Sequence, residues 1–284
     1  MASSNHNKVA LVTGGGSGIG RAMARYFVDQ GYGHVAILDV NEAAGTAVAA
    51  ELTAAPQQAT TVRFVRCNVA SWDDQAAAFA AVHAAAGRID VVMANAGISE
   101  GGASSLVAAA RAENDAGETP PAQPSLRTLD VNLTGVIYTV HLAIHYLKKN
   151  APSADGGRGS IVCTASNAGL YPFPVAPLYA ASKAAVIGLV RSLALPLAPA
   201  QIQINALAPA VLETNITDKT LFANMIMTPM TTLVRGVDEL VRDATHSGDV
   251  AEIHGDRITY RPPTEYVDAD TKTNLDAFWN MGYA

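Results

Sequence analysis

The stretch KVALVTGGGSGIGRAM, residues 8–23, decides the fold. Its first part, 8–13, is an apolar, valine-rich run that predicts a buried β-strand. A cluster of glycines follows at once and predicts a tight turn, and the apolar positions from Ile19 onward have the spacing of one helix face. A strand, a glycine-rich turn and a helix in this order can bring backbone amides and a helix N-terminus close to a pyrophosphate.

The same alternation continues along the chain. Apolar runs predict further strands at 34–39, 62–67, 89–95, 159–166 and 202–208, and periodic segments predict helices at 19–30, 41–54, 71–86, 126–149 and 177–195. Strands with so few charges, separated by amphipathic helices, indicate a parallel sheet covered on both faces. Because crossovers between parallel strands are right-handed, the expected fold is α/β, a doubly wound, Rossmann-type sheet.

No break in composition and no repeat divides the chain, so residues 1–284 are expected to form a single dinucleotide-binding and catalytic domain. Two segments leave the alternation. Residues 98–125 are interpreted as an insertion of a length that is often functional. Residues 212–247 hold Leu221, Phe222 and three methionines at 225–230, and two interpretations stay open for this group, ordinary core packing or a lid over an apolar ligand.

Composition and charge exclude several classes of protein. Apolar residues make up 49%, charged residues 15%, and the formal net charge is −6, which excludes a disordered chain and binding of nucleic acid through phosphate neutralisation. No uninterrupted apolar run reaches the roughly 18–20 residues of a membrane span, and the polar start MASSNHNK has no secretory signal. We therefore expect no membrane contact and a cytoplasmic location. Cys67 and Cys163 are too few for a disulfide scaffold and lack metal-ligand spacing.

Asp39 indicates which dinucleotide would bind. It ends the second predicted strand, 25 residues after Gly14. A carboxylate there can accept hydrogen bonds from both hydroxyls of an adenosine ribose and would repel a 2′-phosphate. Positions 40 and 41 are neither Arg nor Lys, and Ser17 adds no charge to the glycine turn. The pattern favours NAD over NADP, with a solvated loop aspartate as the alternative.

Tyr179 and Lys183 form a candidate catalytic pair. They are four residues apart at the start of a predicted helix, so they share one of its faces. A tyrosine has an ordinary pKa of about 10, and a neighbouring ammonium would lower that pKa toward the range useful for proton transfer. Ser166 ends a predicted strand 13 residues before Tyr179, and Asn132 lies on the preceding helix.

These residues, with the glycine turn and Asn95-Ala96-Gly97, resemble the short-chain dehydrogenase/reductase family over about 8–215. The chain is most similar to the 15-hydroxyprostaglandin dehydrogenase branch of that family. The stretches that carry this similarity are LDVNEAAG (38–45), CNVASWDD (67–74), GGRGSIVCTASNAGL (156–170) and PLYAASKAAVIGLVRS (177–192). The resemblance implies direct hydride transfer between a substrate carbon and nicotinamide C4, with no metal.

The resemblance also implies a proton relay of four residues. Tyr179 would be the general acid/base that exchanges a proton with the substrate oxygen. Ser166 would hydrogen-bond the same oxygen and stabilise its developing charge. Lys183 would lower the Tyr179 pKa and bind the nicotinamide ribose. Asn132 would hold a water that links Lys183 to solvent, and a helix residue bonded only to backbone is the alternative for it.

The resemblance also implies which residues contact the cofactor. They are Gly14, Ser17, Gly18, Ile19 and Gly20 in the turn, Asp39 at the adenosine ribose, Asn68 and Val69 at the adenine, Asn95 and Gly97 at the other ribose with Tyr179 and Lys183, and Pro209, Val211 and Thr214 at the nicotinamide. The sequence departs from the family at Asn68, where Asp is usual, and at Pro209-Ala210, where Pro-Gly is usual. Alanine would be strained there if that position needs a positive φ. Residues 248–284 lack the usual Val-Asp-Gly-Gly ending, so nothing is inferred from them.

The leading interpretation is an NAD-dependent oxidoreductase that interconverts a secondary alcohol and a ketone, in the oxidative direction and on a bulky, apolar substrate. An NADPH-dependent ketoreductase of a biosynthetic pathway is the alternative, and a non-catalytic nucleotide-binding protein is a lesser one. Members of the family usually associate through the helices that correspond to 126–149 and 177–195, so a homodimer or homotetramer is expected.

Overall fold

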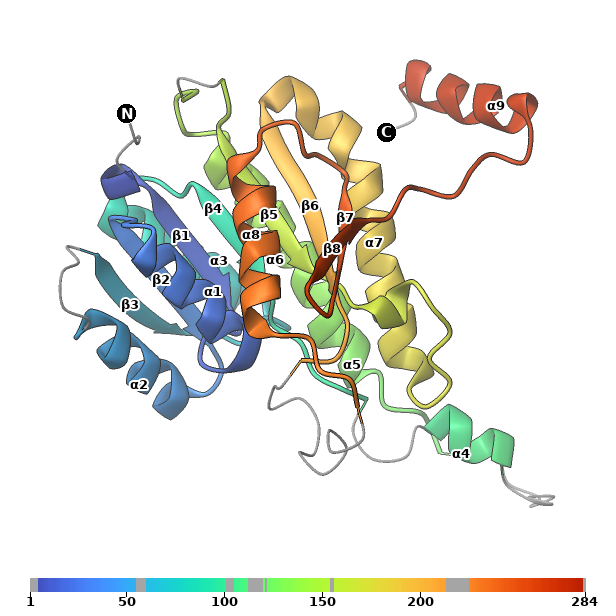
Figure 1. Ribbon diagram of the computed structural model, residues 1–284, viewed down its shortest axis with the longest axis horizontal. Helices are drawn as coiled ribbons and strands as arrows, with labels where there is room; N and C mark the ends of the chain where they lie inside the picture. Colours follow the sequence, from blue (N-terminus) through green and yellow to red (C-terminus); the bar gives the residue numbers. More distant parts are fainter. Residues whose placement is uncertain are drawn as a thin grey trace.

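A computed structural model describes residues 5–54, 60–100, 105–111, 120, 122–153, 156–212 and 225–282. Figure 1 shows a twisted central sheet with helices on both faces and a last helix that stands apart from the body. The sheet has eight strands in the order β3-β2-β1-β4-β5-β6-β7-β8. The first seven are parallel to their neighbours, and β8 is antiparallel to β7.

Six of the eight strands follow the apolar runs predicted from the sequence, and β7 and β8 were not predicted. The eight strands are β1 (Val9–Thr13), β2 (His34–Asp39), β3 (Thr61–Arg66), β4 (Val91–Ala94), β5 (Gly159–Thr164), β6 (Ile202–Pro209), β7 (Val250–His254) and β8 (Arg257–Tyr260). The strands β1, β4 and β7 are almost wholly buried, as expected where helices cover both faces of a sheet. The expected doubly wound α/β fold is confirmed.

The long helices divide between the two faces. On one face lie α1 (Gly18–Asp29), α2 (Glu42–Thr53) and α8 (Met230–Arg242), and on the other lie α3 (Trp72–Ala86), α6 (Gly135–Leu147) and α7 (Pro177–Leu197). The remaining described helices are η1 (Asn5–Asn7), α4 (Ser105–Arg111), α5 (Arg127–Leu129), the π-helix η2 (Asp130–Thr134), η3 (Asn167–Gly169), η4 (Ala198–Ala200) and α9 (Ala269–Asn280).

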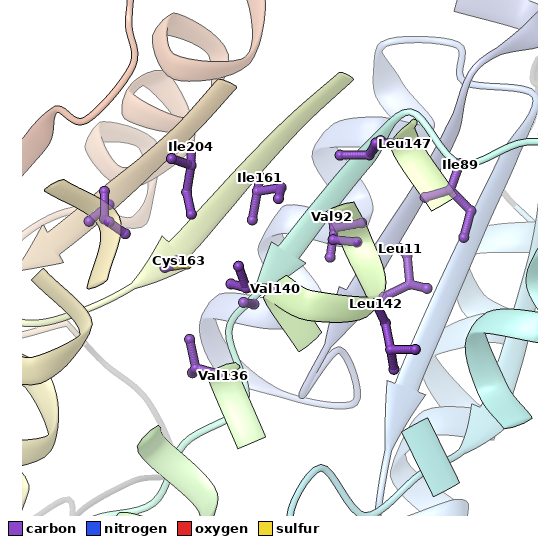
Figure 2. Close-up of a cluster of buried hydrophobic side chains, with 14 of the residues drawn as sticks. Leu11, Ile89, Val92, Val136, Val140, Leu142, Leu147, Ile161, Cys163 and Ile204 are labelled. Atoms are coloured by element: carbon purple, nitrogen blue, oxygen red, sulfur yellow. The ribbon is translucent and has the colours of Figure 1, made fainter. Parts of the chain in front are cut away.

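An apolar core fills the space between the sheet and each helix layer. Figure 2 shows the layer under α3, α6 and α7, where Leu11, Val92 and Ile161 of the sheet lie with Val136 and Val140 of α6. Burying one such side chain contributes roughly 1.5–3 kcal/mol, so these contacts hold the carboxyl ends of the strands in place.

The structure corrects two expectations about the helices. The single helix expected at 126–149 is interrupted by the π-helix η2, which places one more residue in a turn. Of the segment 212–247, residues 230–242 form α8, whose Leu233, Val237 and Leu240 are fully buried against the sheet. This part is therefore core and not a lid, while Leu221 and Phe222 lie outside the described residues. Ile226 is exposed.

The helix from Pro177 to Ala200 is long and apolar enough to cross a membrane by length and composition, which the sequence analysis did not expect. In this structure it packs on the sheet through Val186, Ile187 and Val190 and carries the buried ammonium of Lys183. Because its packed face belongs to the main apolar cluster, we describe it as a core helix.

Candidate active site

The carboxyl ends of β1 and β4 lie next to each other where the order of the strands reverses, which is where a doubly wound sheet has its crevice. In open α/β sheets, ligands bind at such a switch point. Asn95 ties the strand ends together: its Nδ2 donates to the carbonyl of Thr13 at 3.0 Å, and its Oδ1 accepts from the Thr164 hydroxyl at 3.1 Å. Asn95 thus lies at the predicted place, but its amide is used within the protein.

The glycine turn forms a cradle beside this crevice. Gly14 and Gly18 have positive φ angles of 66° and 47°. A Cβ on Gly20 would lie 2.1 Å from the Gly14 carbonyl oxygen, so only glycine allows α1 to pack this closely. Ser17 precedes α1 and makes no side-chain cap, which leaves the amides of the first turn, including that of Ile19, available to an anion. The cradle fits a pyrophosphate.

Asp39 is held at the edge of this cradle. Its Oδ2 accepts from the Gly16 amide and its Oδ1 from the Asn41 amide, each at 2.9 Å. A Cβ on Gly16 would lie 2.9 Å from Oδ2. Because a carboxylate has about four lone-pair sites, two remain for ligand hydroxyls after these bonds. The position fits a ribose.

Asn68 and Val69, which the sequence predicts to contact an adenine, lie shortly after the end of β3. The Asn68 Oδ1 accepts from the Ala70 amide at 3.1 Å, so the carbonyl expected to meet an adenine amine already has a backbone partner. Val69 is buried and packs against Gly135. Its side chain is consequently part of the core as much as of the crevice.

Lys183 reaches the crevice from within α7. The residue is 3% exposed, and its Nζ donates to the Thr164 carbonyl at 2.7 Å. Burial lowers the pKa of Lys183 from 10.5 to about 8. A Cβ on Gly97 would lie 3.3 Å from the Asn132 Oδ1 and 3.5 Å from the Lys183 Nζ, so these three residues form one compact group.

Tyr179 and Ser166 complete the group. The Lys183 Nζ lies 5.6 Å from the centre of the Tyr179 ring, and the Ser166 side chain is near enough to the Tyr179 hydroxyl to influence its pKa. Burial raises the pKa of Tyr179, and the Ser166 side chain lowers it by less. The lowering by Lys183 expected from the sequence is therefore not what the structure gives: loss of water is the largest influence on this pKa, and Lys183 is not among the groups that shift it.

Asn132 lies in the π-helix, fully buried. Its Oδ1 accepts from the Ile98 amide at 2.8 Å, and its Nδ2 donates to the Ile98 carbonyl at 2.9 Å and to the Ser182 hydroxyl at 3.3 Å. The side chain thus fixes the loop after β4 against α7. Two of these bonds are to backbone, as in the alternative, but the third is to a side chain. The π-helix that carries Asn132 is a feature frequent at functional sites.

The predicted nicotinamide side is only partly described. Pro209 ends β6, the Ala210 amide donates to the Ile253 carbonyl at 2.8 Å, and the Val211 carbonyl accepts from Thr228 at 2.7 Å. Among the described non-glycine residues only Gln201 has a positive φ, so alanine at 210 is not strained and that concern is removed. Thr214 lies outside the described residues.

The sequence analysis missed two residues next to Tyr179. The Glu100 Oε2 accepts from the amides of Leu178 and Tyr179, at 2.9 and 3.4 Å, and so caps the start of α7. Phe173 is 41% exposed, with its ring centre 6.2 Å from that of Tyr179. Glu100 lies in the segment 98–125, which the sequence analysis interprets as an insertion. The apolar run YPFPVAP at 171–177 is the signal that could have indicated Phe173 as a residue near the site.

The buried Lys183 predicts a pH-dependent stability. Between about pH 8 and 10.5 the unfolded chain binds more protons than the folded one, so the free energy of unfolding rises with pH. At pH 7, Lys183→Met should raise the free energy of unfolding by about 2–3 kcal/mol, from which the contribution of the lost hydrogen bond to Thr164 is subtracted. Urea unfolding of both chains at pH 7 and pH 10 measures the effect. If the difference in free energy of unfolding between the two chains is as large at pH 10 as at pH 7, the lowered pKa of Lys183 is contradicted.

Comparisons with known proteins show the family to which the chain is similar. A family model described as short chain dehydrogenase matches residues 8–224. A short-chain dehydrogenase/reductase of Penicillium rubens is 37% identical over 200 residues, 70% of this chain and 67% of that protein. The 15-hydroxyprostaglandin dehydrogenase [NAD(+)] of Homo sapiens is 32% identical, with 74% and 70% covered. A 3-ketoacyl-(acyl-carrier-protein) reductase from Brucella melitensis, solved with NADH, has a TM-score of 0.73 at 27% identity, with 88% and 98% covered.

Proposed function

This chain belongs to the short-chain dehydrogenase family of oxidoreductases, and from that premise we propose that it oxidises secondary alcohols to ketones with NAD. One observation carries the proposal: the hydroxyls of Tyr179 and Ser166 and the ammonium of Lys183 come together beside the crevice at the switch point of the sheet. A hydroxyl pair of this kind can hold one substrate oxygen from two sides.

The chain's own residues would handle the proton. Tyr179 would accept the proton of the substrate hydroxyl as the alcohol carbon gives up a hydride, and would return it in the reverse direction. Ser166 would donate a hydrogen bond to the same oxygen. Lys183 would bind ribose hydroxyls, and Asn132 would keep the loop after β4 closed on Lys183. When bound, the nicotinamide supplies the hydride acceptor.

We propose a bulky, apolar substrate on the evidence of the loop before α7. Phe173 lies against Tyr179, and Tyr171 and Val175 of the same loop are also exposed. Exposed aromatic and aliphatic side chains that border a site favour an apolar ligand. The human relative is named for a hydroxylated lipid, which supports this class of substrate.

A screen of NAD reduction tests the proposed activity. The chain is incubated with NAD and a panel of secondary alcohols that runs from small cyclic alcohols to hydroxy-lipids and polycyclic alcohols, and NADH is followed by absorbance. We expect turnover, and we expect kcat/KM to rise with the apolar surface of the alcohol. Each 1.4 kcal/mol of additional binding free energy should raise kcat/KM about tenfold. Phe173→Ala should reduce this rise while leaving the smallest alcohols nearly unaffected. Absence of NADH formation across the panel would refute the proposal.

The other proposals concern assembly and location. We propose a homodimer or homotetramer built through α6 and α7, because α7 leaves the small side chains of Ala181, Ala184 and Gly188 exposed along one face. Small residues allow helices to approach closely, which makes this face suitable for pairing. A cytoplasmic location remains a proposal that rests on the amino-acid composition.

A further inference from the structure

Residues 262–282, here called the C-terminal arm, hold no fully buried side chain within the part of the chain that the structure describes. Residues 262–270 are exposed, and α9, which follows from Ala269, has no buried residue. Figure 1 shows α9 standing away from the sheet at the end of an extended segment. The root of the arm is fixed, because the Arg191 guanidinium of α7 donates to the carbonyls of Arg261 and Pro262 at 3.0 and 2.9 Å.

α9 has an exposed apolar face. Leu275 and Trp279, one turn apart, are 52% and 42% exposed. A helix of 12 residues is marginal on its own in water, and most helix stability in proteins comes from packing an apolar face. The Asp268 cap on the Thr271 amide and the ion pair of Lys272 with Asp276 add only about 1–2 kcal/mol. The arm is therefore built to pack against another surface.

The chain itself offers a matching surface. The helix from Pro177 to Ala200 is strongly apolar, yet only 28% of its most apolar window is buried. At its outer end Leu195 is 57% exposed, four residues from the Arg191 that holds the arm. Leu195 and α9 both stay exposed in the single chain, so they do not cover each other within it. In two chains related by a two-fold axis, each arm can cover the other's α7 at once.

The negative charge of the C-terminal arm favours a second copy of the chain over a membrane as its binding partner. The arm carries four carboxylates, Glu265, Asp268, Asp270 and Asp276, against the single cation Lys272. Membrane surfaces are anionic and attract basic amphipathic helices, so this helix would be repelled. Lys148 and Lys149, exposed at the end of α6 on the same sheet face as α7, offer the opposite charge. We propose that the C-terminal arm docks on a second copy of this chain, with α9 packed over the outer end of that copy's α7.

The first test measures whether α9 is covered. The chain has two tryptophans, so Trp279 is the only one in a Trp72→Phe chain. We expect Trp279 in the assembled full chain to be shielded from acrylamide, and Leu275→Asp to increase its quenching several-fold. Thr273→Asp adds the same charge on the opposite side of α9 and should leave quenching unchanged. Equal quenching in the parent and Leu275→Asp chains, or shielding only after phosphatidylserine vesicles are added, would overturn the proposal.

The second test identifies the surface that covers the arm. Cys67 and Cys163 are buried, so an added surface cysteine reacts selectively. Thr271 lies one turn before Leu275 on the same side of α9. A Thr271→Cys chain and a Leu195→Cys chain, co-expressed with different tags, should be joined by a short bismaleimide into a product of twice the chain mass that carries both tags. Thr273→Cys, on the opposite side of α9, replaces Thr271→Cys as the control and should give much less product. No product with both tags would overturn the proposal. Neither test uses turnover, so both outcomes are independent of the proposed activity.

Discussion

A Tyr179→Phe chain should oxidise secondary alcohols about 10³-fold more slowly than the parent chain, because it lacks the group that exchanges the proton. The affinity for NADH should stay within about twofold, since the substitution keeps the ring and removes only the hydroxyl near Ser166. Steady-state kinetics give kcat, and NADH fluorescence titration gives the dissociation constant. The combination of lost turnover with retained binding is what a proton-transfer role requires.

A matched control separates this effect from general damage to the fold. Tyr260 also has a partly buried hydroxyl, which donates a hydrogen bond to Glu239 at 3.0 Å. Tyr260 lies on β8, away from the crevice. Tyr260→Phe should keep kcat close to that of the parent chain. If Tyr179→Phe turned over as fast as Tyr260→Phe, Tyr179 would have no part in the mechanism.

The second large effect concerns the choice of dinucleotide. With Asp39 fixed by two backbone amides at the edge of the glycine turn, kcat/KM should be about 100-fold higher with NAD than with NADP. A 2′-phosphate would meet this carboxylate at close range, where like charges repel. Asp39→Ala should reduce the ratio of the two kcat/KM values about tenfold or more, mainly by improving KM for NADP.

The same experiment decides between the proposal and its nearest alternative. An NADPH-dependent ketoreductase would show the opposite preference in the parent chain. Assays with both reduced cofactors and a ketone product of the screen give that comparison directly. A clear preference of the parent chain for NADPH would show that Asp39 does not select the cofactor.

The first two-thirds of the fold could be predicted from the sequence because its strands are short apolar runs separated by glycines. The run 8–13, for example, forms β1 at Val9–Thr13. The helix α8 was not predicted although Leu233, Val237 and Leu240 have helical spacing, because the three methionines at 225–230 left core packing and a lid over a ligand both open. The strand β8 has only four half-exposed residues, too short for a signal.

The site was predictable to the level of residue type but not of environment. The spacing of Tyr179 and Lys183 indicated a shared helix face, and the structure places both at the crevice. The direction of the Tyr179 pKa depends on how much water the fold removes, which no local pattern reports. The cap that Glu100 makes on α7 joins residues 78 positions apart, so only tertiary structure reveals it.

A crystal structure with NADH and a non-reacting substrate analogue tests the central claim most directly. The account predicts the Tyr179 and Ser166 hydroxyls within about 3 Å of the analogue's oxygen and the nicotinamide C4 about 3.5 Å from its carbon. Lys183 should lie within hydrogen-bond distance of the nicotinamide ribose. A complex in which the nicotinamide lies elsewhere, with Tyr179 beyond the reach of one bridging water, would contradict it.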